Sequence, residues 1–367
     1  MNLTEKHPLV DGRTANSRLI RAYRGDRPPV TPVWFMRQAG RSLPEYRELR
    51  VGTAMLDACL NPEMSSEITL QPVRRHGVDA AIFFSDIVVP LKLAGVDVNI
   101  VPGRGPVLGA PVRTAEDVAA LRPLDPDALA PIAEGVARTV AELGSTPLIG
   151  FAGAPFTLAA YLVEGGPSKD HLAARTLMHA DPVTWAALLD WAAQVTGAFL
   201  RAQVIAGASA AQLFDSWVGS LSVIDYERYV ARHSAKAIAA VRDLGVPVVH
   251  FGVGTGELLR AMHDVGADVM GVDDRITLSE ANRRLGGRVP LQGNLNPALL
   301  AAPWPVLEAR LRQVLVSGAE APAHVLNLGH GVPPDTDPDV LTRIVELVHS
   351  ESAAGDHSAS GAAHGGE

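Results

Sequence analysis

Residues 246–272 read VPVVHFGVGTGELLRAMHDVGADVMGV and contain two apolar runs with a helical stretch between them. The runs, residues 246–251 and 268–272, end on polar residues or glycine and have the composition of buried parallel strands. The intervening residues 256–265 carry apolar side chains at helical spacing. This strand–helix–strand unit predicts a parallel sheet covered by helices.

The same unit repeats along most of the chain. Eight apolar segments are expected as strands, namely residues 30–36, 80–84, 148–151, 210–214, 246–251, 268–272, 289–292 and 325–328. Helical periodicity occupies most of the intervals, in residues 62–76, 181–206, 225–244, 256–265 and 305–318. Eight repeats favour a closed (β/α)8 barrel over an open doubly wound sheet, although alternation alone is compatible with both.

Two regions depart from the repeat. Residues 96–112 (VDVNIVPGRGPVLGAPV) alternate and contain Gly and Pro, so we expect a β-hairpin inserted after the second strand. Residues 341–349 are expected to form the last helix, and residues 352–367, mostly Ala, Gly, Ser and His, a disordered tail. The prediction is therefore one α/β domain, a single (β/α)8 barrel over residues 1–351, followed by that tail.

The composition argues against several classes of protein. The net charge of −8 disfavours general binding of nucleic acids or anionic membranes. No apolar run is long enough to span a bilayer, and the N-terminus does not have the pattern of a signal peptide, so we expect a soluble cytoplasmic protein. The single cysteine, Cys59, excludes an internal disulfide and a multi-cysteine zinc site.

Polar residues follow the expected strands at equivalent positions. In a (β/α)8 barrel the active site lies at the carboxyl ends of the strands. The residues just past these ends are Arg37, Asp86, Gly153, Asp215, Ser216, Gly252, Asp273, Asp274, Asn294 and His330. We expect Arg37, Asp86, Ser216 and His330 to meet around one mouth of the barrel, although any single one of them could be a structural residue.

Two segments have unusual compositions. Residues 32–50, PVWFMRQAGRSLPEYRELR, include the end of the first expected strand and the loop after it. This segment carries four arginines, namely Arg37, Arg41, Arg47 and Arg50. Arginine pairs bidentately with carboxylates and phosphates, so the segment predicts an anion site, with a solvated basic loop as the alternative. Residues 150–166, GFAGAPFTLAAYLVEGG, form the second segment.

Both segments resemble the signatures of the uroporphyrinogen decarboxylase family. In the first, only Ser42 departs, where the family usually has Tyr, and in the second Phe156 replaces the usual Trp. The resemblance covers nearly the whole chain outside the tail. It continues through residues 61–87, 213–219, 292–297 and 327–338. Asp274 and Asn296 are two further departures, which affect the expected shape of the pocket rim.

This resemblance implies a homodimeric enzyme that removes the four acetate carboxyl groups of uroporphyrinogen III. The products would be coproporphyrinogen III and CO2, formed in haem biosynthesis with neither cofactor nor metal. Asp86 and Arg37 would be catalytic, Asp86 facing the pyrrole N–H groups, with Arg37 or a bound water as proton donor. The residues implied for substrate binding are Arg37, Gln38, Ala39, Gly40, Arg41, Asp86, Tyr161, Ser216 and His330.

Other functions and roles remain as alternatives. A related barrel methyltransferase would need zinc held by Cys and His near strand ends, whereas Cys59 falls just before a helix. A tetrapyrrole carrier would use Asp86 and the arginines without turnover. Tyr161 could pack half-buried on a helix, Ser216 could cap a helix, and His330 could be held by backbone groups of its loop.

Overall fold

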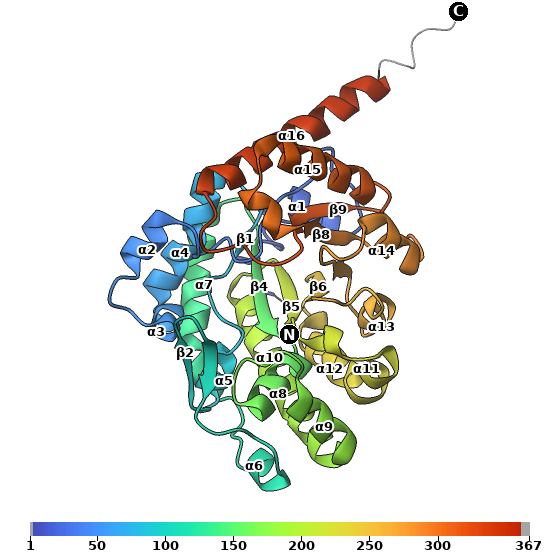
Figure 1. The fold of residues 1–367 in the computed structure, drawn as a ribbon. Coiled ribbons are helices and arrows are strands. Elements are labelled where there is room, and N and C mark those ends of the chain that lie inside the picture. Colours follow the sequence, from blue (N-terminus) through green and yellow to red (C-terminus); the bar gives the residue numbers. More distant parts are fainter. Residues whose placement is uncertain (1–2, 361–367) are drawn as a thin grey trace, which may run out of the picture.

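The computed structural model describes residues 3–360, and a curled parallel β-sheet lies at its centre (Figure 1). Seven strands pair in the order β1-β4-β5-β6-β7-β8-β9, and every pair is parallel. Their bounds are β1 Ala81–Ile82, β4 Leu148–Gly153, β5 Ala210–Asp215, β6 Val248–Gly252, β7 Val269–Gly271, β8 Leu291–Leu295 and β9 His324–Leu328. The predicted α/β class is confirmed, because strands and helices alternate around a parallel sheet.

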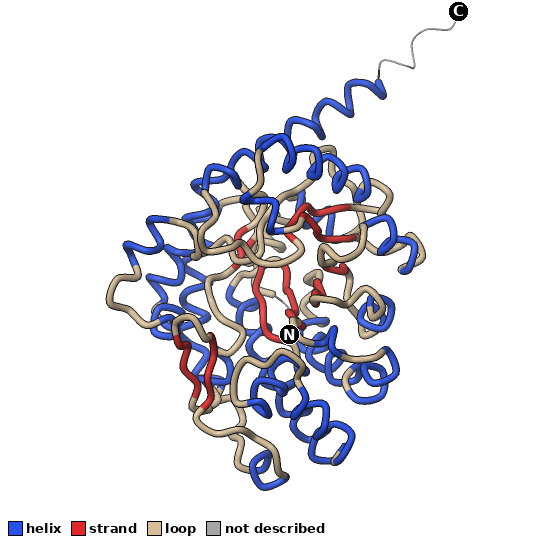
Figure 2. The backbone as a smooth tube through the Cα atoms, viewed as in Figure 1, coloured by secondary structure: helices blue, strands red, loops and turns tan. Residues whose placement is uncertain are grey.

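Helices connect the strands and surround the sheet (Figure 2). The longer ones are α4 Pro62–His76, α7 Ala130–Leu143, α8 Pro155–Glu164, α10 Pro182–Ala206, α12 Ala231–Arg242, α15 Trp304–Gly318 and α16 Pro338–Ser360. The shorter ones are α1 Arg18–Tyr23, α2 Pro44–Leu49, α3 Met55–Leu60, α5 Val89–Leu93, α6 Ala115–Ala119, α9 Leu172–Ala180, α11 Val223–Tyr229, α13 Leu259–Asp264 and α14 Leu278–Arg284. Three 3-10 helices are η1 Pro126–Leu129, η2 Val218–Ser220 and η3 Pro297–Ala301. Within residues 3–360, no helix has the length and apolar character needed to cross a membrane.

The expected first strand is not a regular strand, so the predicted number of eight is wrong by one. Residues 30–36 make only an isolated parallel bridge, between Val33 and Leu326 of β9. Pro32 has no N–H to donate, which interrupts any regular ladder here. The segment nevertheless follows β9, since the Leu326 N–H donates to the Pro32 carbonyl at 2.9 Å and the Trp34 N–H to the Leu326 carbonyl at 3.3 Å.

Asp79 attaches the same segment to the other edge of the sheet, just before β1. Its backbone N–H donates to the Val33 carbonyl at 2.8 Å, and its Oδ2 accepts the Val33 N–H at 2.8 Å. The Oδ2 atom also lies 2.8 Å from Nε2 of His349 in α16, and Arg18 of α1 is 3.3 Å from Oδ1. One carboxylate therefore joins residues 30–36 to the start of β1 and to both terminal helices.

A two-stranded antiparallel pair, β2 (Val98–Val101) and β3 (Gly105–Leu108), occupies residues 96–112, where the sequence predicts a hairpin. The pair stands apart from the central sheet (Figure 2). Leu108 donates its N–H to the carbonyl of Gly165, at 3.1 Å, just after α8 ends. The hairpin is therefore fixed to the end of α8.

The last helix is longer than predicted. The sequence predicts a helix over residues 341–349 and a disordered tail from residue 352, whereas α16 continues to Ser360. The prediction for residues 352–360 is therefore wrong. Adding a residue to an existing helix costs far less than starting one, and Ala353 and Ala354 have the highest helix propensity of any residue type. Residues 361–367, the rest of the predicted tail, lie outside the described residues.

We predict that Asp79→Ala lowers the free energy of unfolding by about 2–3 kcal/mol, because the Val33 N–H and His349 lose a charged partner. The measurement is equilibrium urea denaturation at pH 7. Glu142→Ala is the matched control, since Glu142 is an exposed residue of α7, and it should change stability by no more than about 0.5 kcal/mol. Equal stabilities of the two variants would contradict the role of Asp79.

Candidate active site

A cavity of about 800 Å³ opens at the carboxyl ends of the strands. Its lining combines strand ends, the loops that follow β1, β5 and β9, the segment around residues 36–55 and the β2–β3 hairpin. Seven of the residues predicted for the site line it, namely Arg37, Ala39, Arg41, Asp86, Tyr161, Ser216 and His330. Arg37, Asp86, Ser216 and His330, which the sequence places together at the strand ends, thus line one cavity.

Gln38 and Gly40 were also expected at the site but do not line the cavity. The Gln38 side chain is 2% exposed, and its Nε2 donates to the Ala80 carbonyl at 2.9 Å. Its Oε1 accepts the Phe35 N–H at 2.9 Å, so the amide holds the loop in place and a direct contact with substrate does not fit this geometry. Gly40 has φ of +94°, and a Cβ there would come within 3.3 Å of the Phe84 ring.

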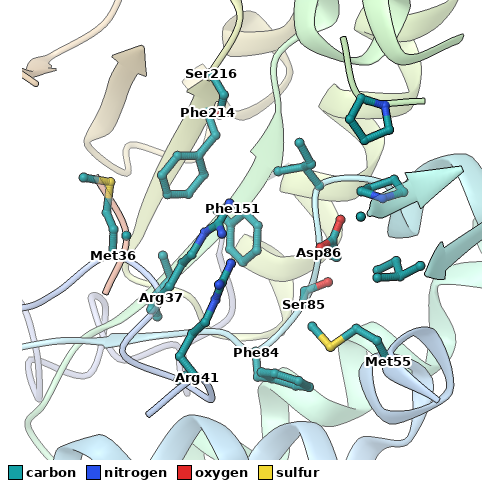
Figure 3. Close-up of a pocket in the computed structure, with 18 of the residues that line it drawn as sticks. Met36, Arg37, Arg41, Met55, Phe84, Ser85, Asp86, Phe151, Phe214 and Ser216 are labelled. Atoms are coloured by element: carbon teal, nitrogen blue, oxygen red, sulfur yellow. The ribbon is translucent and has the colours of Figure 1, made fainter. Parts of the chain in front are cut away.

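The loop that carries Arg37 and Arg41 holds both residues in the left-handed region, with φ of 64° and 51°. Residues other than glycine seldom adopt this conformation, and each such residue costs on the order of 1–3 kcal/mol. The side chain of Arg37 packs on Gly331, where a Cβ would lie 2.7 Å from the Arg37 Cγ. Both arginine side chains extend into the cavity towards Phe151 (Figure 3). The tight packing against Gly331 therefore helps to direct Arg37.

Positive charge is concentrated in the cavity, although the whole protein has a net charge of −8. The cavity is lined by four arginines, namely Arg37, Arg41, Arg50 and Arg104. Arg104, from the turn of the β2–β3 hairpin, was not predicted. Arg47 points elsewhere, because its guanidinium donates to the Pro334 carbonyl at 2.8 Å. Among the described residues, Asp86 is the only carboxylate of the lining, so the cavity suits a ligand with several negative charges.

Asp86 lies in the loop between β1 and α5, across the cavity from the arginine loop (Figure 3). Its Oδ1 accepts the Val88 N–H at 3.0 Å, whereas Oδ2 has no hydrogen-bond partner among residues 3–360. Burial raises the pKa of Asp86, and the Val88 hydrogen bond and the Arg37 charge partly offset this. The side chain retains some exposure because it borders the open cavity. Oδ2 is therefore free to accept hydrogen bonds from a ligand.

Aromatic side chains form another wall of the cavity. Tyr161 of α8 stacks on Trp217, with ring centroids 3.8 Å apart and an angle of 27° between the planes. Burial, and then the Asp86 charge, raises the pKa of Tyr161 to about 12, so the phenol is a neutral donor at physiological pH. Phe151 of β4 and Phe214 of β5 meet edge to face at 5.3 Å and supply an apolar surface beside the arginines.

His330 follows β9 at the rim. Burial lowers its pKa from 6.5, the Arg37 charge lowers it further, and Asp274 opposes the shift. The residue as a whole is exposed, so the ring is only partly buried. The Arg37 cation therefore contributes much of the lowering of the His330 pKa. We therefore expect a neutral imidazole at pH 7.

Part of the lining could not be recognised from the sequence. Trp217 follows Ser216 directly and stands within a segment that matches the family, so its position next to a strand end was an available signal. Tyr46 lies within residues 32–50, which also match the family, but it follows no strand of the central sheet, and Arg104 had neither signal. Their place in the cavity depends on how a loop and a hairpin fold over the strand ends.

The four departures from the family signatures lie outside the cavity lining; they are Ser42, Phe156, Asp274 and Asn296. Phe156 is fully buried and packs edge to face on Trp185, with ring centroids 5.9 Å apart. Asn296 accepts the Ala298 N–H at 2.8 Å as the N-cap of η3. None of the four exchanges therefore changes a side chain of the cavity lining.

Comparison with known proteins agrees with the geometry. A family model described as Uroporphyrinogen decarboxylase (URO-D) matches residues 14–351. The chain belongs to the uroporphyrinogen decarboxylase family. A relative named uroporphyrinogen decarboxylase from Arthrobacter sp. (strain FB24) is 71% identical over 343 residues, 94% of this chain and 99% of that protein. Another from Leifsonia xyli subsp. xyli (strain CTCB07) is 67% identical over 368 residues, 95% of this chain and 98% of that protein.

The fold is also found in a solved structure described as a methyltransferase. A solved structure of a methyltransferase from Methanosarcina mazei superposes with a TM-score of 0.76 at 20% sequence identity. The match covers 92% of this chain and 98% of the methyltransferase. At this identity the likeness concerns the fold alone.

We predict that the pKa of His330 lies below 6.5 and rises in Arg37→Ala, because removing a nearby cation favours the protonated ring. The measurement is an NMR titration of the histidine ring signals. His7 is an internal control, since Arg37 is not among the groups that shift its pKa, and it should titrate identically in both proteins. A His330 titration that Arg37→Ala leaves unchanged would show that the two side chains do not interact.

Proposed function

We propose that this protein is a carboxy-lyase that converts uroporphyrinogen III into coproporphyrinogen III and CO2 by removing four acetate carboxyl groups. The observation that carries the proposal is one carboxylate with a free oxygen, Asp86, opposite several arginines in a cavity of about 800 Å³. Uroporphyrinogen has the complementary pattern, with four N–H donors at its centre and eight carboxylates around its edge. Membership of the uroporphyrinogen decarboxylase family supports the same reaction.

The arginines offset the negative charge of the substrate. Arg37, Arg41, Arg50 and Arg104 contribute four positive charges to the cavity of a protein with a net charge of −8. Guanidinium groups bind carboxylates through paired hydrogen bonds, which fixes both the position and the orientation of an arm. In the proposal, Ser216, Tyr161 and His330 add neutral hydrogen bonds, and the backbone at Ala39 borders the ring.

The chemical step uses the pyrrole itself as the electron sink. A proton is added to the ring carbon next to the one that carries the acetate arm, which gives a cation shared between the arm-bearing carbon and the pyrrole nitrogen. The bond to the carboxylate then breaks, its electron pair neutralises the cation, and CO2 leaves. A second proton adds to the exocyclic carbon, and loss of the first restores the aromatic ring with a methyl substituent. No cofactor enters this sequence.

Asp86 has the properties that this step requires. Its anion lies where positive charge develops on the ring, so their attraction is stronger in the transition state than in the ground state. The free Oδ2 accepts the pyrrole N–H groups, which then replace the solvent that burial removes. The proton donor in the proposal is Arg37 or a water held by it.

Three further features belong to the proposal. Residues 30–36 are hydrogen-bonded to both β9 and Asp79, and in the proposal they take the place of the eighth strand and close a (β/α)8 barrel. The enzyme acts as a homodimer, which light scattering tests. It acts in the cytoplasm, in keeping with a single cysteine that forms no internal disulfide.

Two other functions make different predictions for one experiment. A carrier would bind uroporphyrinogen in the same cavity and return the octacarboxylate unchanged after anaerobic incubation. A zinc-dependent methyl transfer would need a thiolate at the strand ends, whereas Cys59 is buried in α3 and burial raises the pKa of its thiol well above its usual value. Chromatography of the oxidised products, from eight carboxyl groups down to four, distinguishes decarboxylation from both.

We predict that Asp86→Asn lowers turnover by about 100-fold or more, the scale of losing a preorganised electrostatic group. The variant should unfold no more easily than the parent, because a raised pKa means that the folded protein disfavours the Asp86 anion. Product chromatography and thermal unfolding measure the two effects. Asp127→Asn, an exposed residue of η1, is the control that should keep full activity. Full activity of a folded Asp86→Asn protein would refute the assigned role.

A second prediction concerns the arginine forks. Arg37→Lys and Arg41→Lys should each lose roughly 1.5–3 kcal/mol of transition-state binding, because an ammonium cannot reproduce a bidentate contact. Added salt should raise the KM of the parent. Arg138→Lys is the control, since Arg138 is an exposed residue that pairs with Glu134 on α7. If both cavity variants keep the parent kcat/KM, the two arginines do not clamp carboxylates.

A further inference from the structure

A buried acid–imidazole pair lies behind the cavity wall. Asp215 ends β5 and His250 belongs to the neighbouring strand β6, and the side chains of both are 0% exposed. Asp215 Oδ2 lies 3.5 Å from His250 Nε2, and within residues 3–360 neither atom has a hydrogen-bond partner. Both residues lie outside the cavity lining, whereas Phe214, Ser216 and Phe251, next to them in sequence, belong to it.

The partners of the imidazole determine where its protons are. His250 Nδ1 lies 3.1 Å from the Met262 carbonyl oxygen, which only accepts, so Nδ1 carries a hydrogen. Nε2 faces Asp215. A neutral ring beside an ionised carboxylate would set two lone pairs against each other in a water-free interior, which is costly. One additional proton between Nε2 and Oδ2 removes this conflict, whichever of the two atoms holds it.

The pair is connected to the cavity through Thr157 of α8. The Thr157 hydroxyl donates to Asp215 Oδ1 at 2.9 Å and accepts the backbone N–H of Trp217 at 3.3 Å. Trp217 in turn stacks on Tyr161, which lies one helical turn after Thr157. A continuous set of contacts therefore runs from His250 to two side chains of the cavity wall.

We propose that Asp215 and His250 share one proton and, through Thr157, position Trp217 and Tyr161 in the cavity wall. A net-neutral pair can stay buried, whereas a lone carboxylate at the end of β5 would draw water or rotate away. Both are positioning residues, since neither reaches the cavity. The kinetic part of the test rests on the proposed decarboxylation, but the structural part does not.

The first experiment locates the shared proton by NMR in the parent protein at pH 7, with nitrogen-15 in histidine and carbon-13 in aspartate. His324 is an internal control: it is buried beside the Gly293 carbonyl without a carboxylate, and burial lowers its pKa to about 4, so one ring nitrogen is bare. His250→Gln and Asp215→Asn identify the signals of the pair.

Two results support the shared proton: a His250 ring protonated on both nitrogens, or a neutral ring whose Nε2 is hydrogen-bonded to a protonated Asp215. A bare, unbonded Nε2 beside an ionised Asp215 overturns it.

The second experiment tests the link to the cavity. Thr157→Val keeps the shape but removes both hydrogen bonds, and Thr157→Ser keeps the hydroxyl. We expect Thr157→Val to speed hydrogen exchange of the Trp217 amide and to lower kcat/KM about tenfold, with Thr157→Ser close to the parent. Thr139→Val on α7 is the matched control, because Thr139 is also fully buried and donates only to the Gly135 carbonyl.

The outcomes separate the two proposals. Parent-like exchange of Trp217 in Thr157→Val, or an equal effect of Thr139→Val, overturns the positioning role. If the parent fails to decarboxylate uroporphyrinogen while Thr157→Val still speeds Trp217 exchange and Thr157→Ser does not, the proposed function fails and the positioning role stands.

Discussion

The backbone of Val33 is hydrogen-bonded to Asp79 at the β1 edge of the sheet and bridged to Leu326 at the β9 edge. Residues 30–36 therefore connect the two edges of the seven-stranded sheet. This segment continues directly into the loop of Arg37 and Arg41, so the same hydrogen bonds determine where two cations enter the cavity. The left-handed backbone of both arginines is tolerable because the preceding segment is fixed to both sheet edges and the Gln38 amide between the two arginines is hydrogen-bonded to backbone.

The cavity then separates its charges. Arginines approach from the first loop and from the β2–β3 hairpin, and Asp86 approaches from the opposite loop, with phenylalanines between them. Apolar surroundings raise the pKa of Asp86 and make its anion costly to the folded protein. Such a cost is typical of a site whose partner arrives with the ligand, where stability is given up for function.

The aromatic wall depends on residues that no ligand would touch. Trp217 and Tyr161 come from different elements, and a single hydroxyl, that of Thr157, links the loop after β5 to helix α8. The pair of Asp215 and His250 is built on two adjacent strands, so the sheet itself sets their separation. The rigid sheet behind the cavity therefore determines the positions of side chains on the cavity surface.

The sequence alone determined the class of fold, most strand positions and a large part of the site. Strand and helix periodicities are local properties, and parallel strands must end at the same edge, so Arg37, Asp86, Ser216 and His330 could be placed together without a structure. The same reasoning from local sequence failed where a segment remote in the chain determines whether a strand forms. Pro32 interrupts the first strand, and the backbone it follows is contributed by β9, almost three hundred residues later.

Only the tertiary structure decided which side chains face the cavity. Gln38 lies between two cavity residues in sequence but turns to the Ala80 and Phe35 backbone, whereas Arg104 reaches the cavity because the hairpin is attached to the end of α8. The link from His250 to Tyr161 likewise has no sequence signal, since its members are spread over three elements. Hydrogen-bond partners and side-chain directions depend on distances between segments remote in the chain, and those distances exist only after folding.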